Sequence, residues 1–402
     1  MMPAFDDGLW YRNKAVTSKG YKYVTGSNPS LTPNENLTIP NRRGDILDYM
    51  WNVLSNNTRE SNNRLIASAT AYFDLTKDLQ LRGKIATDWT SNLTETKNHS
   101  TIPVAIGGPS GSYGIDNTSY SIFYGDLLLS YTKKVNPNLE LKAMAGYTAD
   151  KETGYFSNVS TKGGLTTENR FDLTSSAQTP YYSGGSKSYL TKDAFIGTVN
   201  ANYKGYLFVE GTLRRDRTST MNPNNNAFVY PSANAALVLS EAFRLPEFVR
   251  YAKLRASWGI VGNYPTQYAA NVAYNLSNLG DQGSGSATLA TTTSTGTYGN
   301  DNIRPEKKHE LEFGLETRLL NDRLTFDVSY YNAKIVDMIV PLQIAQTTGA
   351  SNILTNVGTL QNTGLEFSIS GYPVSGRDFS WESGVNFSFN NNKILKLTNG
   401  ST

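Results

Sequence analysis

Three glutamates, Glu310, Glu312 and Glu316, are the residues whose type and spacing best fit metal binding or acid–base chemistry. Carboxylates bind hard cations and often serve as general acids or bases. The residues between them are mostly apolar, and a period-two pattern places all three on one face of an extended strand. We therefore interpret the cluster as the wet face of a strand and not as an active site.

Other catalytic signals are weak. The segment GGPSGSYG at 107–114 is rich in glycine, but no GK[ST] and no strand-to-helix context follows, which disfavours a phosphate-binding loop. The sequence contains no cysteine, and its two histidines, His99 and His309, are far apart. This excludes thiolate chemistry and disfavours a histidine metal site or a Ser–His relay. We expect no enzyme activity, no cofactor, and no catalytic or metal site.

The charge balance and the hydropathy narrow the class of protein. The chain has 37 basic and 34 acidic residues, a net charge of +3, and these charges are interspersed. A nucleic-acid-binding protein would concentrate its basic residues on one face or arm, so we expect no nucleic-acid partner. No apolar run is long enough for a transmembrane helix, and the N-terminal MMPAFDDGLWYRNKAV is not typical of a signal peptide. A membrane β-barrel stays possible, because its strands need only about 9–11 alternating residues.

Composition and periodicity favour strands joined by turns. The 402 residues include 25 Tyr, 16 Phe and 34 Gly. In one segment, Leu324, Phe326 and Val328 alternate with polar neighbours that include Asp327, and charge stays off one face in the middle of every such segment. Twelve segments alternate in this way: 64–75, 78–89, 121–134, 138–150, 193–204, 206–216, 232–240, 249–260, 308–320, 323–340, 362–373 and 379–392.

Alternation alone also fits a soluble sheet with one buried face, such as a sandwich. The connections favour a barrel, because tight links such as TKD, NPN, KG, NDR and SGRD alternate with long ones. Short turns at one end and long loops at the other are typical of outer-membrane barrels. We therefore predict an all-β fold, an antiparallel transmembrane β-barrel with short periplasmic turns and long extracellular loops. The long links cover 90–120, 151–192, 217–231, 261–307 and 334–361, and the predicted lumen-facing residues include Glu210, Glu310, Glu312 and Asp327.

Five blocks stand out in the second half of the chain: LRRDRTSTMNPNNNAFVYPSANAALVLSE (213–241), LRASWGIVGN (254–263), NIRPEKKHELEFGLETRLLNDRLTFDVSYYNAKIVDMI (302–339), ILTNVGTLQNTGLEFSISG (353–371) and WESGVNFSFNNNKILKL (381–397). In this order they resemble recurrent blocks of the SusC/RagA-type TonB-dependent outer-membrane transporters of Bacteroidetes. Two departures, Arg217 in place of a common glycine and Leu237-Val238-Leu239 without the frequent tryptophan, affect loop shape only.

The resemblance implies a barrel of 22 strands around a plug, embedded in outer-membrane lipid. It also implies a SusD-like surface lipoprotein that caps the outside, energy supplied through TonB, and glycans or peptides as substrates. Residues 1–402 would be part of a single TonB-dependent receptor β-barrel domain, incomplete, with about 12–14 of the 22 strands. The signal peptide, the plug domain and the C-terminal strands would be absent, and TonB would bind a missing N-terminal region.

Aromatic residues in the predicted outer loops are the candidate substrate contacts, because aromatic faces stack on sugar rings. The alternative is that these residues pack the loops or contact the lipoprotein. Two other functions stay open: an outer-membrane adhesin or structural barrel, and a secreted soluble all-β carbohydrate-binding protein. The candidates are Tyr155, Phe156, Tyr181, Tyr182, Tyr264 and Tyr268.

Overall fold

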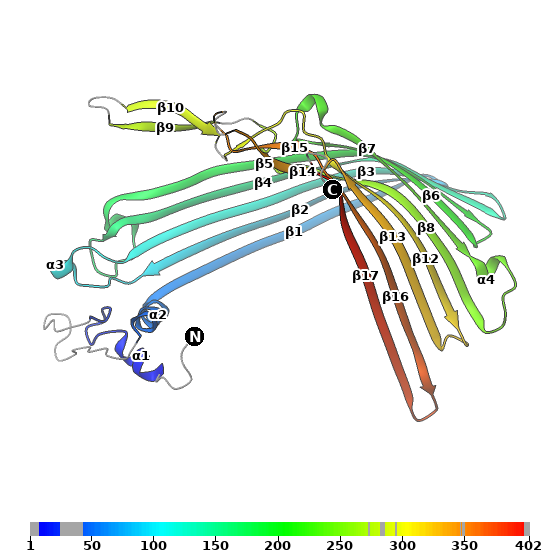
Figure 1. Cartoon of the computed structure of the whole chain (residues 1–402), viewed down its shortest axis with the longest axis horizontal. Helices are drawn as coiled ribbons and strands as arrows, with labels where there is room; N and C mark the ends of the chain where they lie inside the picture. Colours follow the sequence, from blue (N-terminus) through cyan, green and yellow to red (C-terminus); the bar gives the residue numbers. More distant parts are fainter. Residues whose placement is uncertain are drawn as a thin grey trace. The chain divides into compact units, whose positions relative to one another are not determined.

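Twelve strands form one sheet in sequence order, as the computed structural model shows (Figure 1). The structure describes residues 8–24, 43–271, 274–281, 286–293, 296–345, 347 and 350–397. The strand number lies within the predicted range, and the all-β prediction is confirmed. The strands are β1 (Asn56–Thr76), β2 (Leu79–Asn98), β3 (Ser112–Asn136), β4 (Leu139–Leu165), β5 (Ser176–Tyr203), β6 (Leu207–Thr218), β7 (Ala227–Val238), β8 (Val249–Asn263), β12 (Glu306–Leu319), β13 (Leu324–Val336), β16 (Thr359–Ser375) and β17 (Ser380–Lys396).

The chain divides into two compact units. The first comprises Met1–Ala67, Thr87–Ile122 and Glu152–Tyr189. It holds the helices α1 (Gly8–Lys14), α2 (Gly44–Ser55) and α3 (Val104–Gly107). A small apolar core joins α1 to α2. Its buried residues are Tyr11, Ala15, Ile46 and Leu47.

The second unit comprises Ser68–Ala86, Phe123–Lys151 and Leu190–Thr402. Its strands from β5 to β17 pair antiparallel, and β8 pairs with β12 while β13 pairs with β16. Two small sheets and a short helix occupy the connections. They consist of β9 (Tyr274–Asp281) with β10 (Ser286–Thr293), of β11 (Thr297–Tyr298) with β15 (Asn352–Asn356) and β14 (Ile339–Gln343), and of α4 (Leu239–Ala242).

The tight turns form where the sequence predicts them. Between β5 and β6, Lys204 and Gly205 have φ values of 51° and 73°. Two consecutive residues with positive φ match the twist of the flanking strands, and glycine adopts this conformation without strain. Between β12 and β13, the three residues Leu320, Asn321 and Asp322 also have positive φ.

Several strand boundaries differ from the prediction, and two of the differences change the connections. Most of the link predicted at 151–192 is strand, because β4 continues to Leu165 and β5 starts at Ser176. Glycine, serine and threonine hide the alternation there. The prediction of one strand over 323–340 is wrong, since β13 ends at Val336 and Asp337, with a φ of 57°, turns the chain into β14.

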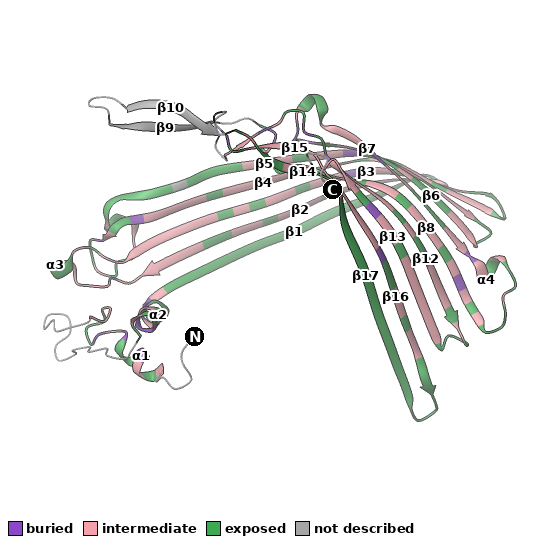
Figure 2. Cartoon of the chain, in the orientation of Figure 1, coloured by how far each residue is buried: buried purple, intermediate pink, exposed green. Residues whose placement is uncertain are grey.

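The alternation gives the sheet of the second unit an apolar face and a polar face. Leu254, Phe313 and Tyr330 on the apolar face are 43%, 50% and 45% exposed, and Figure 2 shows how few strand residues are buried. Buried apolar residues gather instead in the connections, where Met221, Ala270 and Ile303 form a small cluster. Among the described residues, no helix is long and apolar enough to cross a membrane.

Candidate functional site

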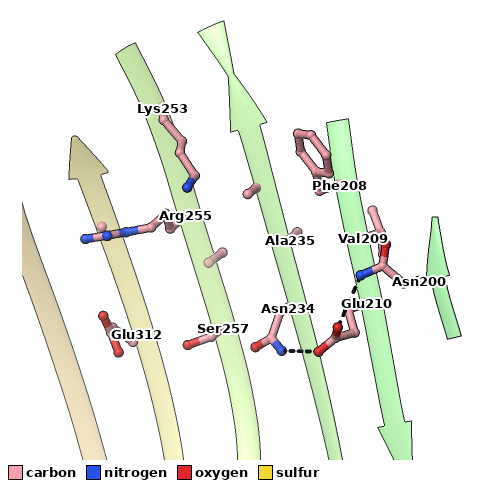
Figure 3. Close-up of a pocket in the computed structure, with 13 residues that line it drawn as sticks. Asn200, Phe208, Val209, Glu210, Asn234, Ala235, Lys253, Arg255, Ser257 and Glu312 are labelled. Atoms are coloured by element: carbon pink, nitrogen blue, oxygen red, sulfur yellow. Dashed lines mark hydrogen bonds between the residues drawn. The ribbon is translucent and has the colours of Figure 1, made fainter. Parts of the chain in front are cut away.

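A row of polar residues crosses five neighbouring strands on the polar face of the second unit. Each member is the register partner of the next, on β5, β6, β7, β8 and β12 in turn. Side chains of paired residues on one face lie about 4.5–5.5 Å apart at Cβ, close enough to interact. Figure 3 shows this polar row, which consists of Asn200, Glu210, Asn234, Ser257 and Glu312.

Glu210 is held between two amides. The Nδ2 atoms of Asn200 and Asn234 each donate a hydrogen bond to one of its carboxylate oxygens, both at 3.2 Å (Figure 3). A carboxylate accepts hydrogen bonds and donates none when ionised, so two neutral donors orient it and leave its charge in place. The row therefore presents a fixed negative group.

Arg255 lies next to this row and carries the opposite charge. Its Nη2 atom donates to Asp327 Oδ1 at 3.0 Å, to Asp327 Oδ2 at 3.2 Å and to Ser329 Oγ at 3.2 Å. The side chains of Arg255 and Asp327 are 36% and 35% exposed. Ion pairs this exposed contribute about 0–1 kcal/mol to stability, so Arg255 and Asp327 can separate and bind other groups at little cost.

The polar row and Arg255 line one open pocket on the polar face. Phe208 contributes an aromatic ring, and Lys253 adds a second cation beside Arg255 (Figure 3). The described residues contain no group of three or more His, Asp or Glu side chains that could hold a metal ion. Carboxylates, amides and cations around an open pocket suit the binding of a polar surface or ligand.

The structure places the four predicted polar residues on this same face. Glu210 and Glu312 belong to the polar row, and Asp327 pairs with Arg255. Glu310 forms an ion pair with Lys308, the residue two positions earlier on its strand. Glu210 and Glu310 are thus held by different partners.

Four of the predicted aromatic contacts lie on strands and not in loops. Tyr155 and Phe156 belong to β4, and Tyr181 and Tyr182 to β5. Neighbouring residues of a strand point to opposite faces, so regular β geometry allows only one of each pair on a given face. Phe156, Tyr181 and Tyr182 are 41%, 56% and 59% exposed.

The other two aromatic residues, Tyr264 and Tyr268, follow β8 and differ from each other. Tyr264 packs against the buried cluster of Met221 and Ile303, and the Tyr230 hydroxyl donates to its oxygen at 3.3 Å. Burial first, and then this hydrogen bond, raise the pKa of Tyr264 far above its usual value. Its environment is that of a packing residue. Tyr268 is 56% exposed in a turn with a φ of 62°.

Three residues that organise the polar face are not among the predicted site residues: Asn200, Asn234 and Arg255. Each lies at a polar position of the alternating pattern, so the sequence shows which face of the sheet it occupies. The sequence does not show the register, and only strand pairing brings Asn200 and Asn234 to Glu210. A second pair, Arg82 with Asp126 at 2.9 Å, also depends on pairing between distant segments.

Comparisons with known proteins show the family to which the chain belongs. Residues 5–401 match the family described as "TonB dependent receptor-like, beta-barrel". The chain is 31% identical over 221 residues to TonB-dependent receptor P3 of Formosa agariphila, covering 53% of this chain and 22% of that protein. It is 25% identical over 415 residues to TonB-dependent receptor SusC of Bacteroides thetaiotaomicron, covering 98% of this chain and 38% of SusC.

A solved structure shows the same fold. The structure of the RagAB peptide transporter superposes with a TM-score of 0.77 at 20% identity, over 87% of this chain and 38% of the RagAB chain. The matched parts of this chain cover 22% to 38% of the length of these proteins. Since the family match extends over nearly every residue, this SusC-like chain belongs to the TonB-dependent receptor-like β-barrel family of the outer membrane.

Proposed function

We propose that this chain forms the central barrel wall of a SusC-like outer-membrane importer, in which plug movement driven through TonB admits glycans or peptides. The observation that carries the proposal is the family match over residues 5–401 on a sheet with one apolar and one polar face. An apolar face suits lipid, and a polar face suits the wet lumen of a barrel.

The chemistry of the polar face supports contact with a movable plug. If this face lines the lumen, Glu210, Glu310, Glu312 and Asp327 present carboxylates to it, and Lys253 and Arg255 present cations. Half-exposed ion pairs break and reform at a cost of about 0–1 kcal/mol. Such a surface holds a polar domain in place and still allows it to leave.

Exposed aromatic residues support substrate contact on the loop side. Phe156, Tyr181, Tyr182 and Tyr268 are each more than 40% exposed. Aromatic rings stack on sugar rings and on the apolar parts of peptides. The relatives favour this role, because SusC is a TonB-dependent receptor and RagAB is a peptide transporter. A SusD-like lipoprotein would bind on the loop side as the partner of the importer.

An uptake assay in the source bacterium tests the proposal. The gene for the protein that contains this chain is deleted and then restored as parent, as Tyr181→Ala/Tyr182→Ala, or as Tyr264→Phe. Uptake of labelled oligosaccharides and peptides is measured with and without functional TonB. We expect the deletion and the loss of TonB to abolish uptake of one substrate class, and the double variant to raise the half-saturating concentration at least fivefold.

Tyr264→Phe is the matched control, because it keeps the packed ring and removes only the hydroxyl that accepts a hydrogen bond from Tyr230. Unchanged uptake of every glycan and peptide after deletion would refute the importer. Full uptake by the double variant would refute only the assignment of Tyr181 and Tyr182.

A further inference from the structure

A cluster of basic residues lies on the apolar face where the apolar rows end. His309 on β12 pairs with Lys334 on β13, Lys334 with Gln361 on β16, and Gln361 with Lys393 on β17. Lys307 lies two positions from His309 on the same face of β12. We define the outer-face basic cluster as Lys307, His309, Lys334 and Lys393.

The distance from the turn end of β12 to the cluster matches the height of the apolar band of an outer-membrane barrel. The apolar side chains of β12 on this face run from Leu319 to Leu311, and His309 is ten positions from Leu319. Ten residues at about 3.3 Å and a tilt of about 40° rise roughly 25 Å, which is the height of the apolar band of an outer-membrane barrel. His309 and Lys334 therefore lie at the level of lipid headgroups.

The cluster lies at the end of the strands that carries the long connections. The links from β8 to β12 and from β13 to β16 both join at this end, next to Glu306 and Val336. In an outer-membrane barrel, long loops face the exterior and short turns face the periplasm. The cluster therefore faces the outer leaflet.

The charges of the cluster are not neutralised by neighbours. The register partners in these two rows, Ile260, Gln361, Gly262, Val336 and Thr359, carry no carboxylate. Within the described part of the chain, no ion pair involves the four basic residues. On the same face of β5 and β6 the situation differs, because Arg217 forms an ion pair with Asp193 at 2.8 Å.

The turn end of the same strands has no such excess. There Asp322 precedes Arg323, and Arg377 precedes Asp378, so each hairpin carries both signs. If charged residues were needed only to mark the edges of the membrane, the loop end and the turn end of these strands would have similar charge compositions. Among the strand residues of the apolar face, the loop end carries only basic charges, because Glu306 at that end belongs to the polar face of β12. This composition indicates an anionic partner in one leaflet only.

We propose that the outer-face basic cluster binds the phosphate groups of a glycolipid in the outer leaflet. The apolar row below it, which consists of Phe313, Tyr330, Leu365 and Phe389 in register order, would contact the acyl chains of the same lipid. From His309 to Lys393 the cluster spans three strand spacings, about 14 Å, which suits a phosphorylated sugar headgroup. Lysine ammonium groups and a histidine N–H donate charge-assisted hydrogen bonds to phosphate oxygens.

A lipid-binding measurement tests this proposal. The whole protein that contains this chain is purified from outer membranes, stripped of lipid in detergent, and titrated with lipid A that carries or lacks its phosphates. Lys334→Gln/Lys393→Gln should weaken binding of phosphorylated lipid A about 30-fold, at about fivefold for each basic residue near an anionic lipid surface. Lys334→Arg/Lys393→Arg should bind like the parent.

Lys308→Gln is the matched control, because Lys308 lies at the same height of β12 on the polar face and should leave binding unchanged. The proposal is wrong if the Gln double variant binds within twofold of the parent, if lipid A without phosphates binds as tightly, or if millimolar inorganic phosphate displaces the lipid completely. Heat-modifiable mobility verifies folding. If the double variant fails to fold, Lys393→Gln alone on β17 should still weaken binding about fivefold.

Discussion

Placing a charge at Leu254 should strongly destabilise the barrel, because this residue lies on the apolar face at mid-height. Leu254 pairs with Leu237 on β7 and with Leu315 on β12. Leu315 is midway between Leu311 and Leu319, which bound the apolar stretch of β12. An arginine at the middle of the membrane costs about 2–4 kcal/mol, so Leu254→Arg should lower the folding equilibrium constant about 30- to 700-fold.

The measurement is the free energy of unfolding in lipid vesicles, from urea titrations followed by heat-modifiable mobility, on the whole protein that contains this chain. Ser368→Arg is the matched control. Ser368 is the register partner of Asp327 and lies on the polar face at nearly the same depth. We expect this control to change stability by less than about 0.5 kcal/mol, as is usual for surface substitutions.

Two results would refute the reasoning about faces. One is a stability for Leu254→Arg within 0.5 kcal/mol of the parent, about the usual range for a surface substitution. The other is an equal loss from Ser368→Arg, since the two faces would then be equivalent. The parent sequence already places Lys253 and Arg255 on either side of Leu254. Charge is therefore tolerated one position away, on the polar face.

Three further predictions follow from individual contacts. Both Gly205 and Gly211 have room for a Cβ, but only Gly205 has a positive φ. In urea titrations, Gly205→Ala should therefore lower the free energy of unfolding by about 1–2 kcal/mol. Gly211→Ala should leave this free energy unchanged or raise it by up to about 1 kcal/mol. A double-mutant cycle with Arg255→Ala and Asp327→Ala should give a coupling of about 0.2–1 kcal/mol, and a value above about 2 kcal/mol would show that the pair is far less solvated than its exposure indicates. Hydrogen bonds from the Tyr21 hydroxyl and the Val104 N–H lower the pKa of Glu168 below 4.5, so their stabilisation is present above pH 4.5 and is lost as the pH falls through the folded-state pKa. The protection factors of the amides around residues 15–23, which correct for the intrinsic pH dependence of exchange, should therefore fall in acid, and Glu168→Gln should remove that fall.

The sequence by itself determined the type of fold and the two faces of its strands. Side chains alternate along an extended chain whatever its neighbours are, so Leu324 and Phe326 separate from Thr325 and Asp327 before any pairing occurs. The tight turn at Lys204-Gly205 was predictable for a similar reason, because positive φ at two successive positions favours glycine. The ordered blocks over 213–397 identified the family.

Only the tertiary structure decided which residues meet. The contacts of Glu210 with Asn200 and Asn234, and of Arg255 with Asp327, depend on the register of four different strand pairs. The lengths of β4 and β5 were also hidden, because glycine, serine and threonine in 151–192 carry no clear alternation, yet pairing satisfies their backbone groups. Tyr155 and Tyr181 are consequently strand residues. Alternation is a local property of the chain, whereas register and strand length depend on hydrogen bonds to a neighbouring strand.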